Sequence, residues 1–187
     1  MHRILFATSN SGKFREVASL AAKLGIQVEW AKFKGVEIQH ENLSEIAKHS
    51  VRQALQRFGR PVMVEDAGLF IEALKGFPGP YSSYVYKTLG VQGILKLMEG
   101  VKRREACFLS AIAYAEPGLE PKVFLGKVEG FIVPEARGSK GFGFDPIFQP
   151  KGSEKTFAEM GVEEKNRFSH RAKALSALAE WLKRGKP

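Results

Sequence analysis

The sequence predicts an α/β fold with a mixed, twisted sheet in two lobes, flanking helices and a central cleft. Strand and helix patterns alternate through the first half of the chain, which is typical of parallel strands joined by helices. Two long strand patterns joined by a short turn follow, and an amphipathic helix comes last. No repeat or linker divides the chain, so we expect residues 1–187 to form a single domain with two lobes.

The first elements are a strand, a helix and a second strand. Residues 4–8 form an apolar run typical of a buried strand. Apolar residues then recur at helical spacing over residues 14–24, and Gly25 stands where a helix C-terminal glycine belongs. Apolar and polar residues alternate over residues 26–30, which predicts a half-buried strand.

A second helix and a third strand follow. Residues 42–45 resemble a capping box, and the helix that they begin should end at Gly59. Residues 61–64 predict a short strand, which would place Glu65 and Asp66 at its carboxyl end.

The second half has a different organisation. Two short helices fill residues 81–98 and are interrupted near Gly90. Residues 106–115 and 122–134 predict an antiparallel hairpin, because the connection between them is rich in turn residues. A last amphipathic helix carries Leu175, Leu178, Ala179 and Leu182.

Composition limits the class of protein. The chain is 44% hydrophobic and 26% charged, which is typical of a globular protein. Cys107 is the only cysteine, so an internal disulfide is excluded and a reducing compartment is expected. The apolar run at residues 4–7 is too short for a signal-peptide core or a membrane span. We therefore expect a cytoplasmic protein without a membrane partner.

The charge balance favours an anionic partner. The chain has 29 Lys and Arg against 20 Asp and Glu, a net charge of +9. Either nucleic acid or a phosphorylated small molecule fits this charge, and so does a merely solubilising surface. The basic residues are spread along the chain, with only residues 102–104 as a compact run, whereas a nucleic-acid footprint is more often concentrated.

The loop at residues 8–13, TSNSGK, joins the first strand to the first helix. It lacks the glycine spacing of a Walker loop, because Ala7 and Phe14 occupy the diagnostic positions. Small residues before a helix nevertheless let backbone N–H groups converge on an anion. Lys13 lies in the first helical turn, where the helix dipole disfavours a cation unless an anion is near. The loop alone fits either a phosphate site or a simple helix cap.

Acidic residues form a second cluster. Glu37 and Glu41 precede the second helix, and Glu65 and Asp66 follow the third strand. Two carboxylates brought together by the fold would suit Mg²⁺, which usually takes one or two carboxylates plus phosphate and water oxygens. Glu37 and Glu41 could equally be solvated.

Two further clusters lie near the C-terminus. Residues 142–146, FGFDP, combine glycine with aromatic rings on which a base can stack, although such rings can also fill the edge of a core. In residues 165–171, KNRFSHR, Ser169 can cap the last helix and leave His170 and Arg171 in its first turn. That run suits an anion or a carbonyl oxygen, or it is a solvated basic face.

Together these clusters resemble the inosine triphosphate pyrophosphatase family over about residues 3 to 182. The resemblance implies two lobes around a substrate cleft, a homodimer, Mg²⁺ dependence, and a small nucleotide as partner rather than stable nucleic acid. It implies hydrolysis of ITP, dITP or XTP to the monophosphate and pyrophosphate. The motifs occur in the family's order: TSNSGK, the Glu37/Asp66 pair, GFPGPY at 76–81, GFGFDP at 141–146 and EKNRFSHR at 164–171.

Carried over to this sequence, the resemblance assigns residues to each part of the substrate. Glu37 and Asp66 resemble the metal ligands, and Asp66 is also the candidate general base. Asn10 and Lys13 would be the main side-chain contacts of the triphosphate loop, and Phe142 would stack on the purine. The full set of substrate-binding residues is Thr8, Ser9, Asn10, Ser11, Gly12, Lys13, Ala67, Phe142, Gly143, Phe144, Asp145, Lys165, His170 and Arg171.

One position departs from the family. Many relatives carry a lysine within the second helix, and Ser50 takes its place here. Lys48 and Arg52 lie on other faces of that helix, so a phosphate contact from it is in doubt.

Two other functions remain open from the residues alone. One is a basic protein that binds RNA or DNA through aromatic residues without catalysis. The other is a nucleotide-pool hydrolase of related fold that clears modified pyrimidine or methylated nucleotides.

Overall fold

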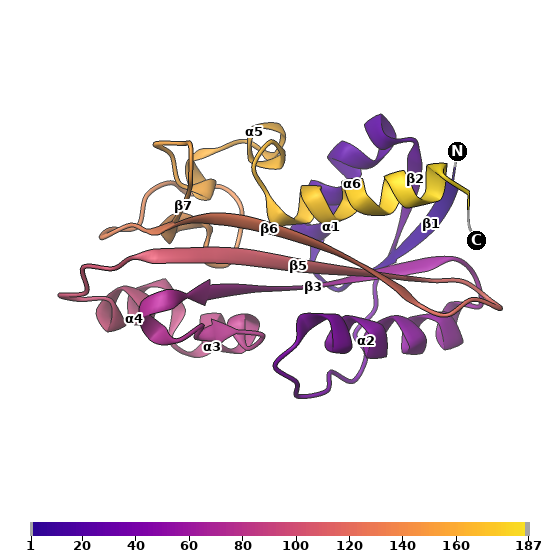
Figure 1. Ribbon diagram of the computed structural model, residues 1–187, viewed down its shortest axis with the longest axis horizontal. Coiled ribbons are helices and arrows are strands. Elements are labelled where there is room, and N and C mark those ends of the chain that lie inside the picture. The colour runs from indigo at the N-terminus through magenta and orange to yellow at the C-terminus, as the bar shows by residue number, and fades with distance from the viewer. Residues whose placement is uncertain (1, 186–187) are drawn as a thin grey trace.

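The computed structural model describes residues 2–185, which form one twisted sheet with helices on both faces (Figure 1). The strands are β1 (His2–Ala7), β2 (Ile26–Ala31), β3 (Val62–Ile71), β4 (Pro78–Gly79), β5 (Glu105–Ala115), β6 (Lys122–Ile132) and β7 (Phe148–Pro150). The α-helices are α1 (Ser11–Ala21), α2 (Leu43–Phe58), α3 (Ser82–Thr88), α4 (Gly90–Leu97), α5 (Val162–Asn166) and α6 (His170–Lys183).

The sheet is mixed, as the sequence predicts. Within residues 2–185 it has seven strands in the order β2-β1-β3-β5-β6-β7, with β4 paired to β3 off this path. β1 pairs in parallel with β2 and β3, because helices connect these strands. β3, β5 and β6 pair antiparallel, and β5 and β6 form the predicted hairpin.

Strand alternation builds two hydrophobic cores at one end of the sheet. Phe6 and Met63 face α1 and α6, whereas Leu5 and Val62 face α2. Successive side chains of a strand point to opposite faces, so both faces of this end are buried under helices. The start of β1 and the end of α6 lie at this end of the sheet (Figure 1).

A third core lies at the other end of the long strands. Leu69 and Ile71 of β3 pack there with α4 and with the segment around Phe148 and Phe157. The strands β3, β5 and β6 therefore run from the first two cores to the third. The part of β3 at residues 65–68 lies between the residues that contribute to these cores, which puts its polar side chains where the cores meet.

β3 is longer than the sequence indicated. It continues through Ile71 instead of ending at Val64, so Glu65 and Asp66 lie within the strand and not at its carboxyl end. The parallel pairing with β1 stops at Met63, but the antiparallel pairing with β5 continues along the whole strand. Acidic residues are rare inside strands, and here the ladder to β5 overrides that preference.

Helix ends largely follow the predicted signals. Gly25 and Gly59 adopt left-handed conformations with φ of 82° and 63° after their helices, and Ser169 caps α6. The predicted capping box at α2 is only half formed. Asn42 accepts the N–H of Ser44, but the carboxylate of Glu45 pairs with a lysine in its own helix instead. Between residues 2 and 185, no helix has both the length and the apolar character needed to cross a membrane.

Candidate active site

The loop after β1 is organised around the start of α1. Asn10 is the N-cap residue, and its side-chain oxygen accepts the N–H of Lys13 at 3.1 Å. The Thr8 hydroxyl accepts the N–H of Asn10 at 3.1 Å. Ser9 and Ser11 are exposed, and Gly12 is buried. The loop therefore presents small residues at a helix N-terminus, which is the geometry that favours anions.

The anion that Lys13 requires is supplied by β3. The Lys13 ammonium lies 2.8 Å from Oε2 of Glu65 and donates to the Glu65 carbonyl oxygen at 2.9 Å. The Glu65 side chain is fully buried, and Ser110 Oγ donates to its Oε1 at 2.7 Å. Burial alone would raise the pKa of Glu65, but Arg171 and Lys13 hold it well below its usual range. Glu65 is thus ionised and pairs with cations, not with Asp66.

Asp66 points to the opposite face of the sheet. Its neighbours of the same parity, Val62 and Val64, pack in the core under α2, on the side of the loop that carries Glu37. Burial raises the pKa of Asp66 to about 6; the charge of Lys13 opposes this shift, and Glu65 and Glu37 add to it. A bound cation would stabilise the ionised form of such a carboxyl group, whose pKa is raised by burial and by nearby carboxylates.

Asp66 and Glu37 fit a magnesium ion in their donor chemistry. Across residues 2–185, no three His, Cys, Asp or Glu side chains converge into a metal cage made by the protein alone. Mg²⁺ does not need one, because one or two carboxylates with phosphate and water oxygens complete its shell.

Gln53 of α2 holds the loop before Glu37, a role that the sequence did not reveal. Its side-chain amide donates to the Val36 carbonyl at 2.7 Å and accepts the Val36 N–H at 3.0 Å. Within residues 2–185, these are the hydrogen bonds that fix residues 33–38. Gln53 thereby sets the backbone one residue before the expected metal ligand.

A buried ion network lies between α1 and α6. The Lys165 ammonium contacts Glu16 Oε1 at 2.5 Å and Asp145 Oδ2 at 2.6 Å. Arg171 pairs with Glu16 and lies 3.1 Å from Glu65 Oε1. Lys165 and Arg171 are each only 2% exposed. The alternative that residues 165–171 form a solvated basic face is therefore wrong for both side chains.

The acids of this network differ in their pKa shifts. Burial would raise the pKa of Glu16, but Arg171 and Lys165 together lower it. For Asp145, burial dominates and raises the pKa despite the contact with Lys165. The sequence alone does not reveal Glu16 as part of the site, because a glutamate in α1 gives no sign of partners about 150 residues away.

The ring of Phe142 joins the two predicted ligand loops. It lies 5.0 Å from the Lys165 ammonium and 5.5 Å from the Arg171 guanidinium carbon. A Cβ added to Gly12 would come 2.5 Å from Phe142 Cδ1, so the ring packs directly against the loop at the start of α1. The fold thus brings residues 8–13 and residues 142–145 together, although they are far apart in sequence.

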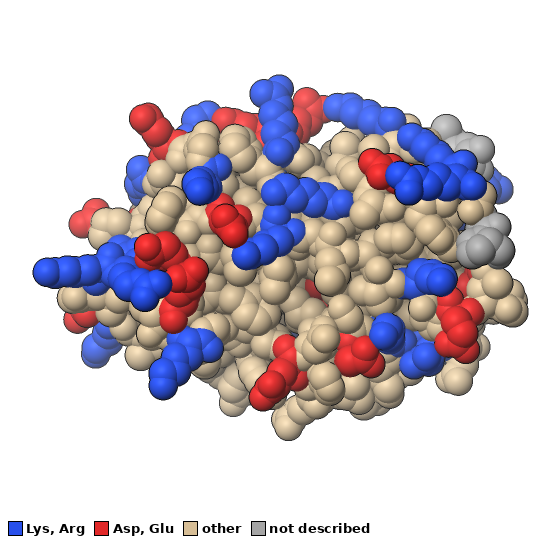
Figure 2. Space-filling model, viewed as in Figure 1, with Lys and Arg blue, Asp and Glu red and all other residues tan. Residues whose placement is uncertain are grey.

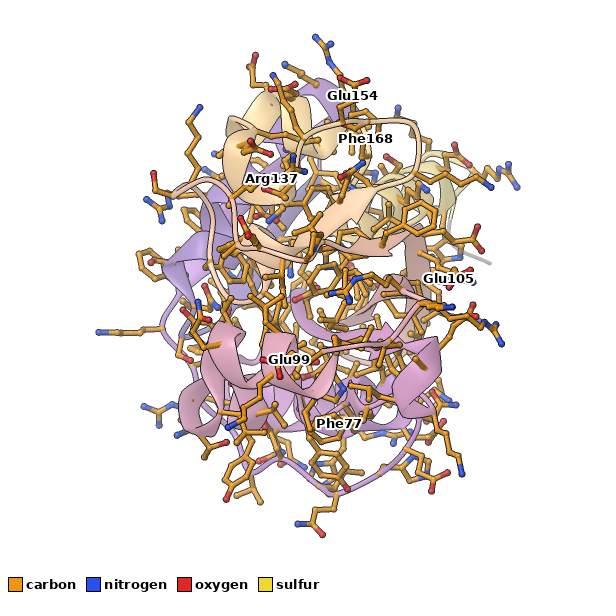
Figure 3. The ribbon with its side chains drawn as sticks, turned by 90° about the vertical axis from the view of Figure 1, so that its left-hand side faces the viewer. Phe77, Glu99, Glu105, Arg137, Glu154 and Phe168 are labelled. Carbon is orange, nitrogen blue, oxygen red and sulfur yellow. The ribbon has the colours of Figure 1, made fainter. Side chains whose placement is uncertain are left out.

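The loop that carries Phe142 is fixed at both ends. Asp145 accepts the N–H of Phe142 at 3.0 Å, and Gly141 and Gly143 have φ of 73° and 62°, which favours glycine. Arg137 donates to the Glu154 carbonyl oxygen at 3.1 Å and its own carbonyl accepts from Thr156. Arg137 and Glu154 lie near each other at the same end of the molecule (Figure 3).

Phe144 has a different environment from Phe142. Its ring is 3% exposed and packs edge-on against Tyr86 with centroids 5.5 Å apart. The side chain of Phe144 therefore belongs to a core, so only its backbone is available to a ligand. Ala67 and Gly143 are half-buried and likewise offer backbone groups.

Two buried polar atoms at the start of α6 lack partners among residues 2–185. They are Nε of Arg171 and Nδ1 of His170. The His170 ring stacks on Phe108 with centroids 4.8 Å apart, and burial lowers the pKa of His170 well below its usual value, with Arg171 adding to the effect. A buried N–H without a partner is costly, so these atoms favour a polar ligand here.

The remaining sequence candidates lie elsewhere. Ser50 is buried, while Lys48 and Arg52 pair with Glu45 and Glu120 on the surface, so α2 offers no free cation at any of these positions. Glu41 is exposed.

Charge on the surface is scattered. Arg104 of the compact basic run donates to the carbonyl oxygens of Ile132 and Met98 and thereby closes the end of the hairpin. Arg103 pairs with Glu72. On the face seen in Figure 2, lysines and arginines are interspersed with acidic side chains, without the concentrated stripe typical of a nucleic-acid footprint.

The fold is a mixed sheet with flanking helices, in which the loop between β1 and α1 packs against the glycine-rich aromatic loop at residues 141–145. This arrangement is typical of proteins that bind an anionic ligand with a planar group. Residues 4–181 match the family described as the Ham1 family. The chain belongs to the Ham1 family.

Individual relatives agree with this assignment. A dITP/XTP pyrophosphatase of Methanopyrus kandleri is 52% identical over 97% of this chain and 96% of its own length. Another, of Thermococcus kodakarensis, is 52% identical over 97% of both chains. Among solved structures, a HAM1 protein from Coxiella burnetii has a TM-score of 0.84 and 33% identity, covering 99% of this chain and all of the other.

Proposed function

We propose that this protein hydrolyses the deaminated purine nucleoside triphosphates ITP, dITP and XTP to the nucleoside monophosphate and pyrophosphate, with Mg²⁺, and so cleanses the nucleotide pool. It is a nucleoside-triphosphate pyrophosphatase. The observation that carries the proposal is the packing of Phe142 against Gly12, which puts an aromatic platform beside a helix N-terminus. Relatives about 50% identical over nearly the whole chain are named dITP/XTP pyrophosphatases.

The triphosphate is bound by the loop Thr8–Lys13. Its backbone amides and the N-terminus of α1 favour phosphate oxygens, and Lys13 offsets the negative charge that grows on the leaving pyrophosphate.

The base is selected by the polarity of hydrogen bonds. Hypoxanthine and xanthine carry a carbonyl oxygen at C6, whereas adenine carries an amino group there. Arg171 offers only donors, and its Nε–H has no partner among residues 2–185, so it pairs with the carbonyl and repels the amino group. Guanine also has the carbonyl, and its rejection must therefore arise at C2.

Asp66 acts on the attacking water. With a pKa of about 6 it is mostly ionised at neutral pH, and it remains basic enough to accept a proton. Asp66 and Glu37 would hold the Mg²⁺, which supplies charge stabilisation to the phosphate oxygens. We place the attack at the α-phosphorus, so that the bond to the bridging oxygen breaks and pyrophosphate leaves.

A panel of purine and pyrimidine triphosphates, assayed with and without Mg²⁺, tests the proposal. We expect Mg²⁺-dependent turnover of ITP, dITP and XTP. No turnover of any triphosphate would favour a binding protein, and a preference for pyrimidines would favour the other class of pool hydrolase. Hydrolysis in ¹⁸O-water should label the monophosphate; label in pyrophosphate would reject attack at the α-phosphorus.

The proposal includes a homodimer in the cytoplasm. The single cysteine and the nucleotide substrate support that location. Tyr84 of α3, Leu97 of α4 and Leu89 between these helices are 69%, 47% and 50% exposed, an apolar surface that suits a protein contact. Light scattering should give about twice 20.7 kDa, and a fully active monomer would refute the dimer.

A further inference from the structure

The charged side chains near the two ligand loops form one continuous chain of contacts. Each neighbour in the chain has the opposite charge, and three basic groups balance three acidic ones. In order, the chain is Lys13, Glu65, Arg171, Glu16, Lys165 and Asp145. It begins in the phosphate loop and ends at the residue that holds the N–H of Phe142.

Within this series of ion contacts, Glu65 links Lys13, which we expect to bind phosphate, to Arg171, which we expect to bind the base. One carboxylate oxygen lies 2.8 Å from the Lys13 ammonium, and the other lies 3.1 Å from a terminal nitrogen of Arg171. Antiparallel pairing with β5 fixes the backbone of Glu65, and Ser110 of β5 donates one neutral hydrogen bond to its Oε1 in addition to the two ion contacts. A buried carboxylate with two cationic partners and a locked orientation sets where both cations lie.

We propose that Glu65 is a positioning residue for substrate selection, which orients Arg171 toward the base and holds Lys13 until a triphosphate takes it. This inference rests on the proposed function. Under this proposal Glu65 contacts neither the phosphate nor the base, but it affects both phosphate binding and base discrimination.

The two roles of Glu65 have opposite consequences for binding. A phosphate that approaches Lys13 must compete with the Glu65 carboxylate, so Glu65 weakens phosphate binding. The same carboxylate holds the guanidinium of Arg171 in place, so it strengthens the discrimination between a C6 carbonyl and a C6 amino group. Removing only its charge should therefore improve one property and impair the other.

The variant Glu65→Gln tests this, because it keeps the shape and an acceptor for Ser110 but removes the charge. We expect inorganic pyrophosphate, titrated calorimetrically in excess Mg²⁺, to bind about threefold or more tightly. We expect the ratio of kcat/KM for ITP over ATP to fall about tenfold or more, the scale of a lost charge-assisted hydrogen bond. A merely structural role would weaken both properties together. Failure of either change overturns the proposal.

Two further variants control for folding. Ser110→Ala removes a neutral donor from the same carboxylate oxygen and leaves both ion contacts, so its pyrophosphate affinity and ITP/ATP ratio should stay near the wild-type values. Glu65→Asp keeps the charge on a shorter side chain and should shift both quantities in the same directions as Glu65→Gln, but less. If Glu65→Gln does not fold, the proposal is tested with Glu65→Asp. An unchanged pyrophosphate affinity and ITP/ATP ratio in that variant would overturn the proposal.

The experiment also separates this inference from the proposed function. The pyrophosphate titration does not depend on turnover. Wild-type protein that hydrolyses no triphosphate would reject the function, whereas a selective wild-type enzyme whose ITP/ATP ratio survives Glu65→Gln would reject the role of Glu65 alone.

Discussion

Glu65 and Asp66 are adjacent acids with different chemistry, because a strand sends successive side chains to opposite faces. Glu65 meets Lys13 and Arg171 and its pKa is lowered, while Asp66 faces the side of Glu37 and its pKa is raised to about 6. Two consecutive positions of β3 therefore supply an ionised carboxylate that pairs with cations, Glu65, and a more basic one, Asp66, for which we propose metal binding and proton acceptance.

Asp66→Asn should lower kcat by at least about 100-fold, since it removes the proposed metal ligand and proton acceptor. The fold should survive, because the amide is close in shape. Glu37→Gln should lower turnover less, and high Mg²⁺ should partly restore it, because this variant weakens only an exposed proposed ligand. Steady-state kinetics over a Mg²⁺ series checks both, and near-normal turnover in Asp66→Asn would remove this residue from the mechanism.

Metal affinity should depend on pH through Asp66. Below a pKa of about 6 the carboxyl is protonated, and a metal must displace that proton. We expect the affinity for Mn²⁺, measured by electron paramagnetic resonance without nucleotide, to be about tenfold weaker at pH 5 than at pH 7. In Asp66→Asn the difference should shrink. Equal wild-type affinity at both pH values would contradict the assignment of Asp66 as a ligand.

At the scale of elements, the site depends on the close packing of loops that the sequence keeps far apart. The loop before α1 touches the loop at residues 142–145, and the loop before α2 is held by Gln53 from within α2. The cap at Asn10, the glycine conformations at residues 141 and 143 and the side chain of Gln53 contribute to fixing these loops. Small changes at these contacts should therefore alter function more than stability.

Gly12→Ala is one such change. Its added methyl would collide with the ring of Phe142, which must then move away from the start of α1. We expect kcat/KM for ITP to fall about tenfold or more, because a displaced platform misplaces the base. Gly161→Ala is the matched control, since nothing lies within 4 Å of its added Cβ and its φ is −72°. Equal kinetics in the two variants would show that Phe142 does not act as a platform.

Gln53→Ala should release the loop before Glu37. We expect the Mg²⁺ concentration for half-maximal activity to rise about tenfold, the effect typical of residues that orient a metal ligand. Turnover at saturating Mg²⁺ and the melting temperature should change little, because the amide is near the surface. Arg52→Ala, which removes only a surface ion pair with Glu120 from the same helix, should leave the Mg²⁺ requirement unchanged. An unchanged Mg²⁺ requirement in Gln53→Ala would mean that the loop before Glu37 keeps its conformation without Gln53.

At the scale of the whole molecule, the sequence predicted the order of elements and the mixed sheet. The spacing of apolar residues and the glycines that end helices are local signals, which can be read without the fold. It placed the end of β3 too early, because acidic residues mimic a strand end, and it missed Glu16 and Gln53. Their partners lie in other elements, and only the packed fold brings them together.

Selection of the base tests the central claim most directly. Wild-type protein should be given equal concentrations of ITP, ATP and GTP in one Mg²⁺-containing mixture, and the consumption of each followed chromatographically. We predict that ITP disappears at least about 100-fold faster than either competitor, since a site built around a hydrogen bond rejects a mismatched base strongly. Consumption of ATP or GTP at a rate comparable to ITP would contradict the account.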